Sequence, residues 1–133
     1  MPVRILCVFA IAGLIFVMEP LWGHHSVAAQ YDVSKSITVT GTVTKVEWKN
    51  PHVFFYISLK DATGKVIDWE LELGSTSGLL RRGWTRNSLK PGDSVTVNGY
   101  PARDGSNLAN ALAVTLSNGR KVFAGSAEEA PAR

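Results

Sequence analysis

Three histidines are the side chains in this sequence best suited to bind a metal ion. His24 and His25 are adjacent near the N-terminus, and His52 follows the Asn50-Pro51 pair in the middle of the chain. If His24 is the first residue of a processed chain, its α-amine and imidazole can chelate one ion, and His25 or His52 can add a third nitrogen. Nitrogen ligands in a planar arrangement favour Cu(II), as in the similar histidine brace of copper enzymes, although no oxidase motif accompanies them here. The alternative is that His52 only caps a turn and the N-terminal pair binds nothing.

The position of His24 depends on how the N-terminus is processed. Arg4 precedes an uncharged apolar run over residues 5–18, which ends at a Glu-Pro pair. This order is typical of a secretory signal peptide, and the run is too short to span a bilayer comfortably. We expect cleavage after Gly23, so that residues 1–23 leave and a periplasmic or secreted protein without a membrane span remains. A cut after Ala29 is the alternative, and it would remove both N-terminal histidines.

Composition narrows the function classes further. The only cysteine, Cys7, lies in the apolar run and would leave with the signal, so the mature chain could form no disulfide, cysteine nucleophile or zinc ribbon. A net charge of +3 is mild, and it falls short of the basic stripe that nucleic-acid binding usually needs. With 133 residues, of which 45% are hydrophobic, one globular domain is expected.

Residues 37–59 read as a β-hairpin that organises the rest of the chain. The first strand alternates apolar residues or glycine with threonine, and the alternation slips near Lys45, which predicts a bulge. Asn50-Pro51 closes the turn, and a second strand is expected from His52 to Leu59. Its core face would carry Val53, Phe55, Ile57 and Leu59, and its other face His52, Phe54 and Tyr56.

The remaining pattern predicts the fold. A third strand over residues 66–73, a short helix over 78–82, strands over 94–100 and 108–116, and a short sixth strand over 121–124 are expected, with Trp84 and Leu89 holding the helix to the core. This order is typical of an all-β protein with one short helix, an OB-fold-like five-stranded Greek-key barrel, with a small β-sandwich as the alternative. We assign residues 24–35 to an N-terminal arm, 36–124 to the barrel and 125–133 to a disordered tail.

The turn and loop ends of an OB-fold are where that fold most often binds. For a ligand that the sequence does not specify, either a small molecule or a protein, the candidate residues are Trp48, Asn50, Phe54, Tyr56, Arg103 and Asp104.

Two charged sets have ordinary structural explanations. Asp68, Glu70 and Glu72 share one side of the third strand, which is the usual solvated side of a strand rather than a pair of catalytic acids. Arg81, Arg82, Arg86 and Lys90 surround the helix, and with the nearby aromatic residues they would suit a single-stranded nucleic acid or another anionic ligand. Export argues against nucleic acid, so a solvated face or a docking surface for an acidic partner is preferred. Standard catalytic signatures are absent, and this favours a binding or accessory protein over an enzyme.

Five short segments resemble a known family. They are His24-His25-Ser26, Thr40-Gly41-Thr42-Val43, Trp48-Lys49-Asn50-Pro51-His52, Arg81-Arg82-Gly83-Trp84 and Ser88-Leu89-Lys90-Pro91-Gly92-Asp93. Together they look like the domain of unknown function 6152 family of exported bacterial proteins. The resemblance implies export and a signal that ends just before His-His-Ser, although Leu21-Trp22-Gly23 stands here in place of an Ala-x-Ala-like site. It implies no activity.

Overall fold

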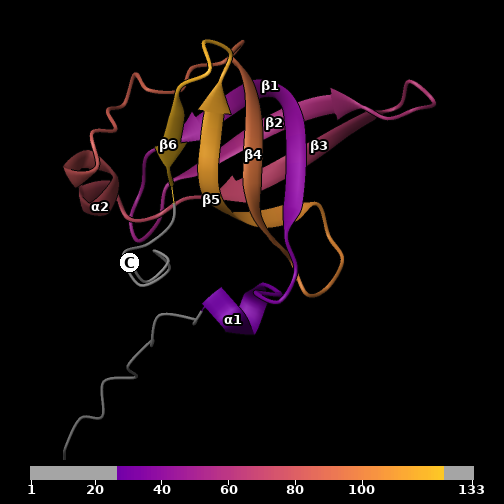
Figure 1. Ribbon diagram of the computed structural model, residues 1–133, viewed down its shortest axis with the longest axis horizontal. Helices are drawn as coiled ribbons and strands as arrows, with labels where there is room; N and C mark the ends of the chain where they lie inside the picture. The colour runs from indigo at the N-terminus through magenta and orange to yellow at the C-terminus, as the bar shows by residue number, and fades with distance from the viewer. Residues whose placement is uncertain (1–26, 125–133) are drawn as a thin grey trace, which may run out of the picture.

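The computed structural model describes residues 27–124, which form one barrel preceded by a short arm (Figure 1). In chain order the elements are helix α1 (Val27–Gln30), strands β1 (Ile37–Glu47), β2 (Phe54–Lys60) and β3 (Val66–Glu72), helix α2 (Thr76–Arg81), and strands β4 (Ser94–Pro101), β5 (Leu108–Leu116) and β6 (Lys121–Phe123). The expected signal peptide and tail, and with them His24 and His25, lie outside the described residues. Within residues 27–124 no helix is both long and apolar enough to cross a membrane.

The strand pairing closes the barrel. β1 pairs with β2 on one edge and β4 on the other, while β3 and β5 extend the sheet on either side. The circle is completed where β3 runs parallel to β5, with Leu71 opposite Ala109. A closed five-stranded barrel with a helix between its third and fourth strands is an OB-fold, so the predicted fold is confirmed and the β-sandwich alternative is wrong. The sixth strand, also predicted, pairs with β5 only.

The bulge predicted near Lys45 is present in β1. The register with β2 shifts between Val43 and Lys45. Before the shift, Ile37 to Thr42 pair with β4, and after it the strand pairs with β2 alone. The extra residue bends the strand, which lets one long strand belong to both sides of the barrel.

The two faces of β2 are as the sequence predicts. Phe55 and Ile57 are fully buried, whereas Phe54 and Tyr56 are only half-buried on the outside. β2 begins at Phe54 rather than at His52, so His52 lies in the connection between β1 and β2. The interior is filled mainly by aliphatic side chains from all five barrel strands and from Val53, just before β2. The buried residues are Val39, Val43, Val53, Phe55, Ile57, Leu71, Val95, Val97, Ala109, Ala111 and Val114.

Helix α2 begins two residues earlier than predicted. The Ser75 side chain accepts a hydrogen bond of 3.1 Å from the Gly78 amide, which caps the first turn. Leu79 on the inner side of the helix is fully buried, and Trp84 and Leu89 are 3% exposed, so the predicted anchoring of this segment is confirmed. The segment from α2 to Leu89 is therefore packed against the barrel.

Gly41 and Gly99 mark places where strands approach too closely for a side chain. A Cβ at Gly41 would lie 2.8 Å from the Ser58 carbonyl oxygen, and one at Gly99 would lie 2.1 Å from the Asn110 carbonyl oxygen. The absence of a side chain at Gly41 thus admits β2 at the point where β1 curves.

Candidate functional site

Glu72 is a buried carboxylate at the end of β3, with 7% of its surface exposed. Strand alternation predicts that it is solvated together with Asp68 and Glu70. Asp68 is indeed exposed and Glu70 partly so, but the prediction is wrong for Glu72. The reason is tertiary: β3 meets β5 at this position, and Tyr31 of the arm, 1% exposed, reaches across to it.

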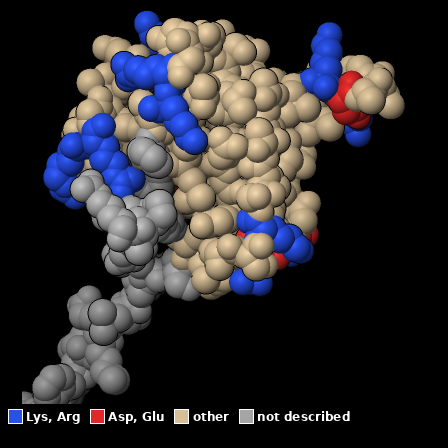
Figure 2. Space-filling view, in the orientation of Figure 1, with Lys and Arg blue, Asp and Glu red and all other residues tan. Residues whose placement is uncertain are grey.

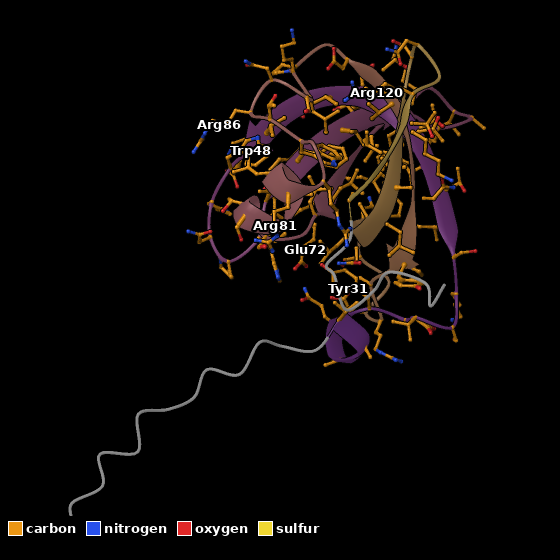
Figure 3. All side chains as sticks on the ribbon, turned by 60° about the vertical axis from the view of Figure 1, so that its left-hand side comes forward. Tyr31, Trp48, Glu72, Arg81, Arg86 and Arg120 are labelled. Atoms are coloured by element: carbon orange, nitrogen blue, oxygen red, sulfur yellow. The ribbon has the colours of Figure 1, made fainter. Side chains whose placement is uncertain are left out.

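Both oxygens of the Glu72 carboxylate are engaged. The Tyr31 hydroxyl donates a short hydrogen bond to Oε2, and His52 Nδ1 makes a close polar contact with Oε1. Figure 3 shows Tyr31 and Glu72 together at the end of the barrel nearest α1. One buried side chain therefore links the N-terminal arm to the turn between β1 and β2.

This contact orients the imidazole of His52. An ionised carboxylate can only accept hydrogen bonds, so a neutral ring beside it carries its proton on Nδ1 and leaves the Nε2 lone pair for a ligand. The His52 side chain is 27% exposed, which leaves part of the ring accessible. Histidines that bind metals are usually held by this kind of carboxylate contact on the other nitrogen.

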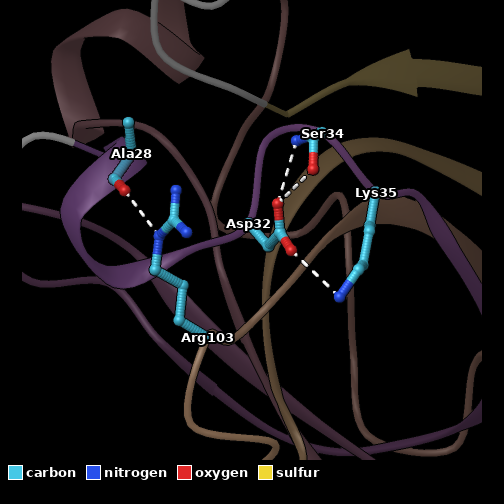
Figure 4. Close-up of polar contacts among 5 residues, drawn as sticks. All are labelled: Ala28, Asp32, Ser34, Lys35 and Arg103. Atoms are coloured by element: carbon cyan, nitrogen blue, oxygen red, sulfur yellow. Dashed lines mark hydrogen bonds and ion pairs between the residues drawn. The ribbon is translucent and has the colours of Figure 1, made fainter.

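The arm is fastened to the barrel beside this site. Asp32 donates from its amide to the Pro101 carbonyl at 2.9 Å, and Arg103 donates from its amide to the Gln30 carbonyl at 3.0 Å. The Arg103 guanidinium also donates through Nε to the Ala28 carbonyl at 2.8 Å (Figure 4). The sequence predicts an arm with little periodicity, but these bonds hold its second half in a helical turn and a short bridge.

A second cluster stabilises the chain just after Tyr31. The Asp32 carboxylate accepts hydrogen bonds from the amide and hydroxyl of Ser34, at 3.1 and 2.6 Å, and pairs with Lys35 Nζ at 3.1 Å (Figure 4). The Ser34 hydroxyl, and next the Lys35 ammonium, lower the pKa of Asp32 from 3.8 to about 2. The turn that leads into β1 is thus held by an ionised aspartate.

The predicted aromatic ligand residues lie near cations of the protein itself. Lys49 Nζ lies 5.1 Å from the centre of the Phe54 ring, and Lys45 Nζ lies 5.4 Å from that of Tyr56. The Arg86 guanidinium lies 5.8 Å from the Trp48 ring. A base that stacked on these rings would compete with these cation–π contacts, which does not favour a single-stranded nucleic acid here.

Glu47 forms ion pairs with both of these lysines, Lys45 and Lys49. Its carboxylate pairs with Lys45 and, at 2.8 Å, with Lys49, and these two ammonium groups lower the pKa of Glu47 from 4.5 to about 2. Tyr56 donates its hydroxyl to the same carboxylate at 3.3 Å. The outer surface of the hairpin is therefore a connected charged layer.

The other predicted ligand residues make local structural contacts. Asn50 accepts a hydrogen bond of 3.0 Å from the Thr76 hydroxyl, which ties the turn to α2. Asp104 accepts from the amide and hydroxyl of Ser106, at 2.9 and 2.6 Å, and these bonds lower its pKa. Arg103 holds the arm, as described above. The structure thus brings Asn50 and the three aromatic residues to the hairpin, whereas Arg103 and Asp104 belong to the loop beside α1.

The barrel alone does not assemble a complete metal site. Residues 27–124 contain no group of three or more His, Cys, Asp or Glu side chains arranged to hold an ion. Sequence reasoning selected His52 but missed Tyr31 and Glu72, which orient it. Tyr31 is the only large aromatic residue of the arm over residues 24–35, and this was the available signal for it.

The fold defines the class of this protein, and comparison with known proteins identifies its family. The closed five-stranded barrel with its helix after β3 makes this a small OB-type β-barrel protein. The chain belongs to a family of unknown function, DUF6152, which matches residues 12–111. A comparison with curated proteins finds no significant match.

Among solved structures, the crystal structure of the mitochondrial single-stranded DNA-binding protein Rim1 from S. cerevisiae is similar, with a TM-score of 0.49 and 9% identity. The similarity covers 62% of this chain and 93% of that chain. At this level it carries no information about function.

Proposed function

We propose that the protein is an exported β-barrel accessory protein that binds a transition-metal ion, with Cu(II) preferred and His52 as the ligand from the barrel. The observation that carries the proposal is the double contact of Glu72, which orients His52 and fastens the arm through Tyr31. A protein of this kind would bind or deliver its ion rather than catalyse a reaction, in keeping with the absence of catalytic signatures.

Export rests on the sequence. Arg4 and the apolar run over residues 5–18 have the order of a signal peptide, and a cut after Gly23 would leave His24 at the new N-terminus. The amine and imidazole of His24 would then form a chelate on one residue. His25 would add a further nitrogen beside it.

The position of the arm supports a shared site. Tyr31 and His52 contact the two oxygens of one carboxylate, so the arm is attached next to the imidazole. Only residues 24–30 separate the expected N-terminus from that attachment. Four residues of helix and three extended residues span up to about 17 Å, so the N-terminal nitrogens can lie at most about that far from the attachment beside His52.

The donor set favours copper. Imidazole and amine nitrogens rank Cu(II) above the other divalent ions of the first transition row. Each nitrogen must be deprotonated to bind, so the affinity should fall on acidification. Glu72 would act on the ion through His52, because both of its oxygens are already engaged.

The first experiment is the intact mass of the exported protein. A mass that corresponds to a start at His24 supports the proposal. A start at Gln30 would remove both N-terminal histidines and with them the amine chelate.

The second experiment is a Cu(II) titration of the mature protein and matched variants. We expect His52→Ala and Glu72→Gln each to weaken binding by about 10- to 100-fold, since losing a ligand or the carboxylate that orients it has effects of at least this size. Asn50→Ala, which changes the same turn without removing the imidazole, should bind as the wild type does. One extra alanine before His24 should weaken binding strongly.

Two results would reject the proposal. If the extra alanine leaves the affinity unchanged, the amine is not a ligand. If the wild type binds Cu(II) no more tightly than an unstructured peptide with two adjacent histidines, the barrel contributes nothing to the site. Thermal unfolding in metal-free buffer checks that each variant is folded.

A further inference from the structure

A second surface of the protein, around α2, combines positive charge with an exposed leucine. Arg81 ends α2, and Arg82, Arg86 and Lys90 lie in the loop that follows; we call these four residues the basic face. All four are exposed. Figure 2 shows Lys and Arg side chains gathered where α2 lies in Figure 1, with no Asp or Glu among them.

Most of this charge is not balanced by the barrel. Within residues 27–124, Arg81, Arg86 and Lys90 form no ion pair with a carboxylate. Lys45 and Lys49, by contrast, are paired with Glu47 on the hairpin. The basic face can therefore attract an anionic partner.

The exposed side chain of Leu80 favours a lipid surface over an acidic protein as the anionic partner. Leu80 precedes Arg81 on α2 and is 55% exposed, while Leu79 beside it is fully buried and holds the helix in place. Nearby, Arg86 lies over the half-buried ring of Trp48, and Figure 3 shows Arg86 and Arg81 on the same side of the molecule. An acidic protein would be attracted by the cations alone, whereas an exposed leucine and a tryptophan among arginines suit the boundary between lipid headgroups and acyl chains.

We propose that the basic face docks on an anionic phospholipid surface, with Leu80 inserted among the headgroups and the cations paired with lipid phosphates. The helix cap at Ser75 and the burial of Leu79, Trp84 and Leu89 make this a preformed platform. Docking is reversible and weakened by salt, because it rests on a few charges and one apolar side chain. It is independent of metal binding at His52.

The test is binding of the mature protein to vesicles of phosphatidylglycerol or phosphatidylcholine, measured by co-sedimentation. We expect binding to phosphatidylglycerol only, and weaker binding at high salt. Arg81→Gln with Arg86→Gln should lower the vesicle affinity about 25-fold, since each cation near an anionic surface contributes about fivefold. Leu80→Ala should lower it about tenfold through lost apolar burial.

The matched control is Lys60→Gln with Lys65→Gln. These lysines lie at the β2–β3 turn, at the opposite side of the molecule from α2 in Figure 1, and the control removes the same charge. It should retain nearly all binding. Equal binding to both lipids, or an equal loss in the control, overturns the proposal. A loss in the arginine variant with no effect of Leu80→Ala also overturns it, because the proposed docking requires Leu80 to insert among the headgroups.

Discussion

Tyr31 and Glu72, 41 residues apart in the chain, are joined by a buried hydrogen bond from the phenol to Oε2. This bond connects the arm before β1 to the last residue of β3. His52 contacts the other oxygen of the same carboxylate. The arm, the β1–β2 connection and the β3–β5 pairing that closes the barrel therefore meet at one side chain. The geometry of the proposed metal ligand thus depends on an arm that lies outside the barrel sheet.

The Tyr31 bond should contribute measurably to stability. We expect Tyr31→Phe to lower the free energy of unfolding by about 1.5–3 kcal/mol, the range for hydrogen bonds to charged groups. Urea unfolding of the mature protein measures this loss. Tyr56→Phe is the matched control, because its hydroxyl also meets a carboxylate, at 3.3 Å on a partly buried surface, and should lose less than about 1 kcal/mol. Equal losses would show that the Tyr31 contact contributes no more than a surface bond.

The two faces of β2 should differ in their response to truncation. Phe55 is fully buried and Phe54 is not, so Phe55→Ala should cost about 3–5 kcal/mol and Phe54→Ala clearly less. Denaturant unfolding of both variants provides the comparison. A similar cost at the two positions would mean that the outer face is covered in solution.

Asp32 should make the arm sensitive to acid. Its pKa is lowered from 3.8 to about 2 by the Ser34 hydroxyl and the Lys35 ammonium, so folding favours the ionised form. The stabilisation is fully present above about pH 4 and is lost as the pH falls toward 2. Wild type should therefore be more stable than Asp32→Asn at pH 6, and the difference should shrink between pH 4 and 2. Thermal unfolding across this range measures it, and a difference that does not vary with pH would contradict the role of the charge.

Much of the fold could be predicted because its signals are local. Alternating β-branched residues define β1, the slip in that alternation locates the bulge at Lys45, and the apolar side of β2 is visible in Phe55 and Ile57. The order of strands and helix was then enough to select an OB-fold. Boundaries were less accurate, as at α2, because the Ser75 cap extends the helix into residues with weak helix propensity.

The candidate site could be predicted only in part. The sequence by itself determined that His52 follows a turn and that its side chain is chemically able to bind a metal. It could not show that Glu72 is buried, because the alternation of β3 is the same whether or not another segment covers its end. Only the tertiary structure decided this, because β3 pairs with β5 and Tyr31 packs over the end of β3. These contacts join residues far apart in the chain, and no local sequence pattern records them.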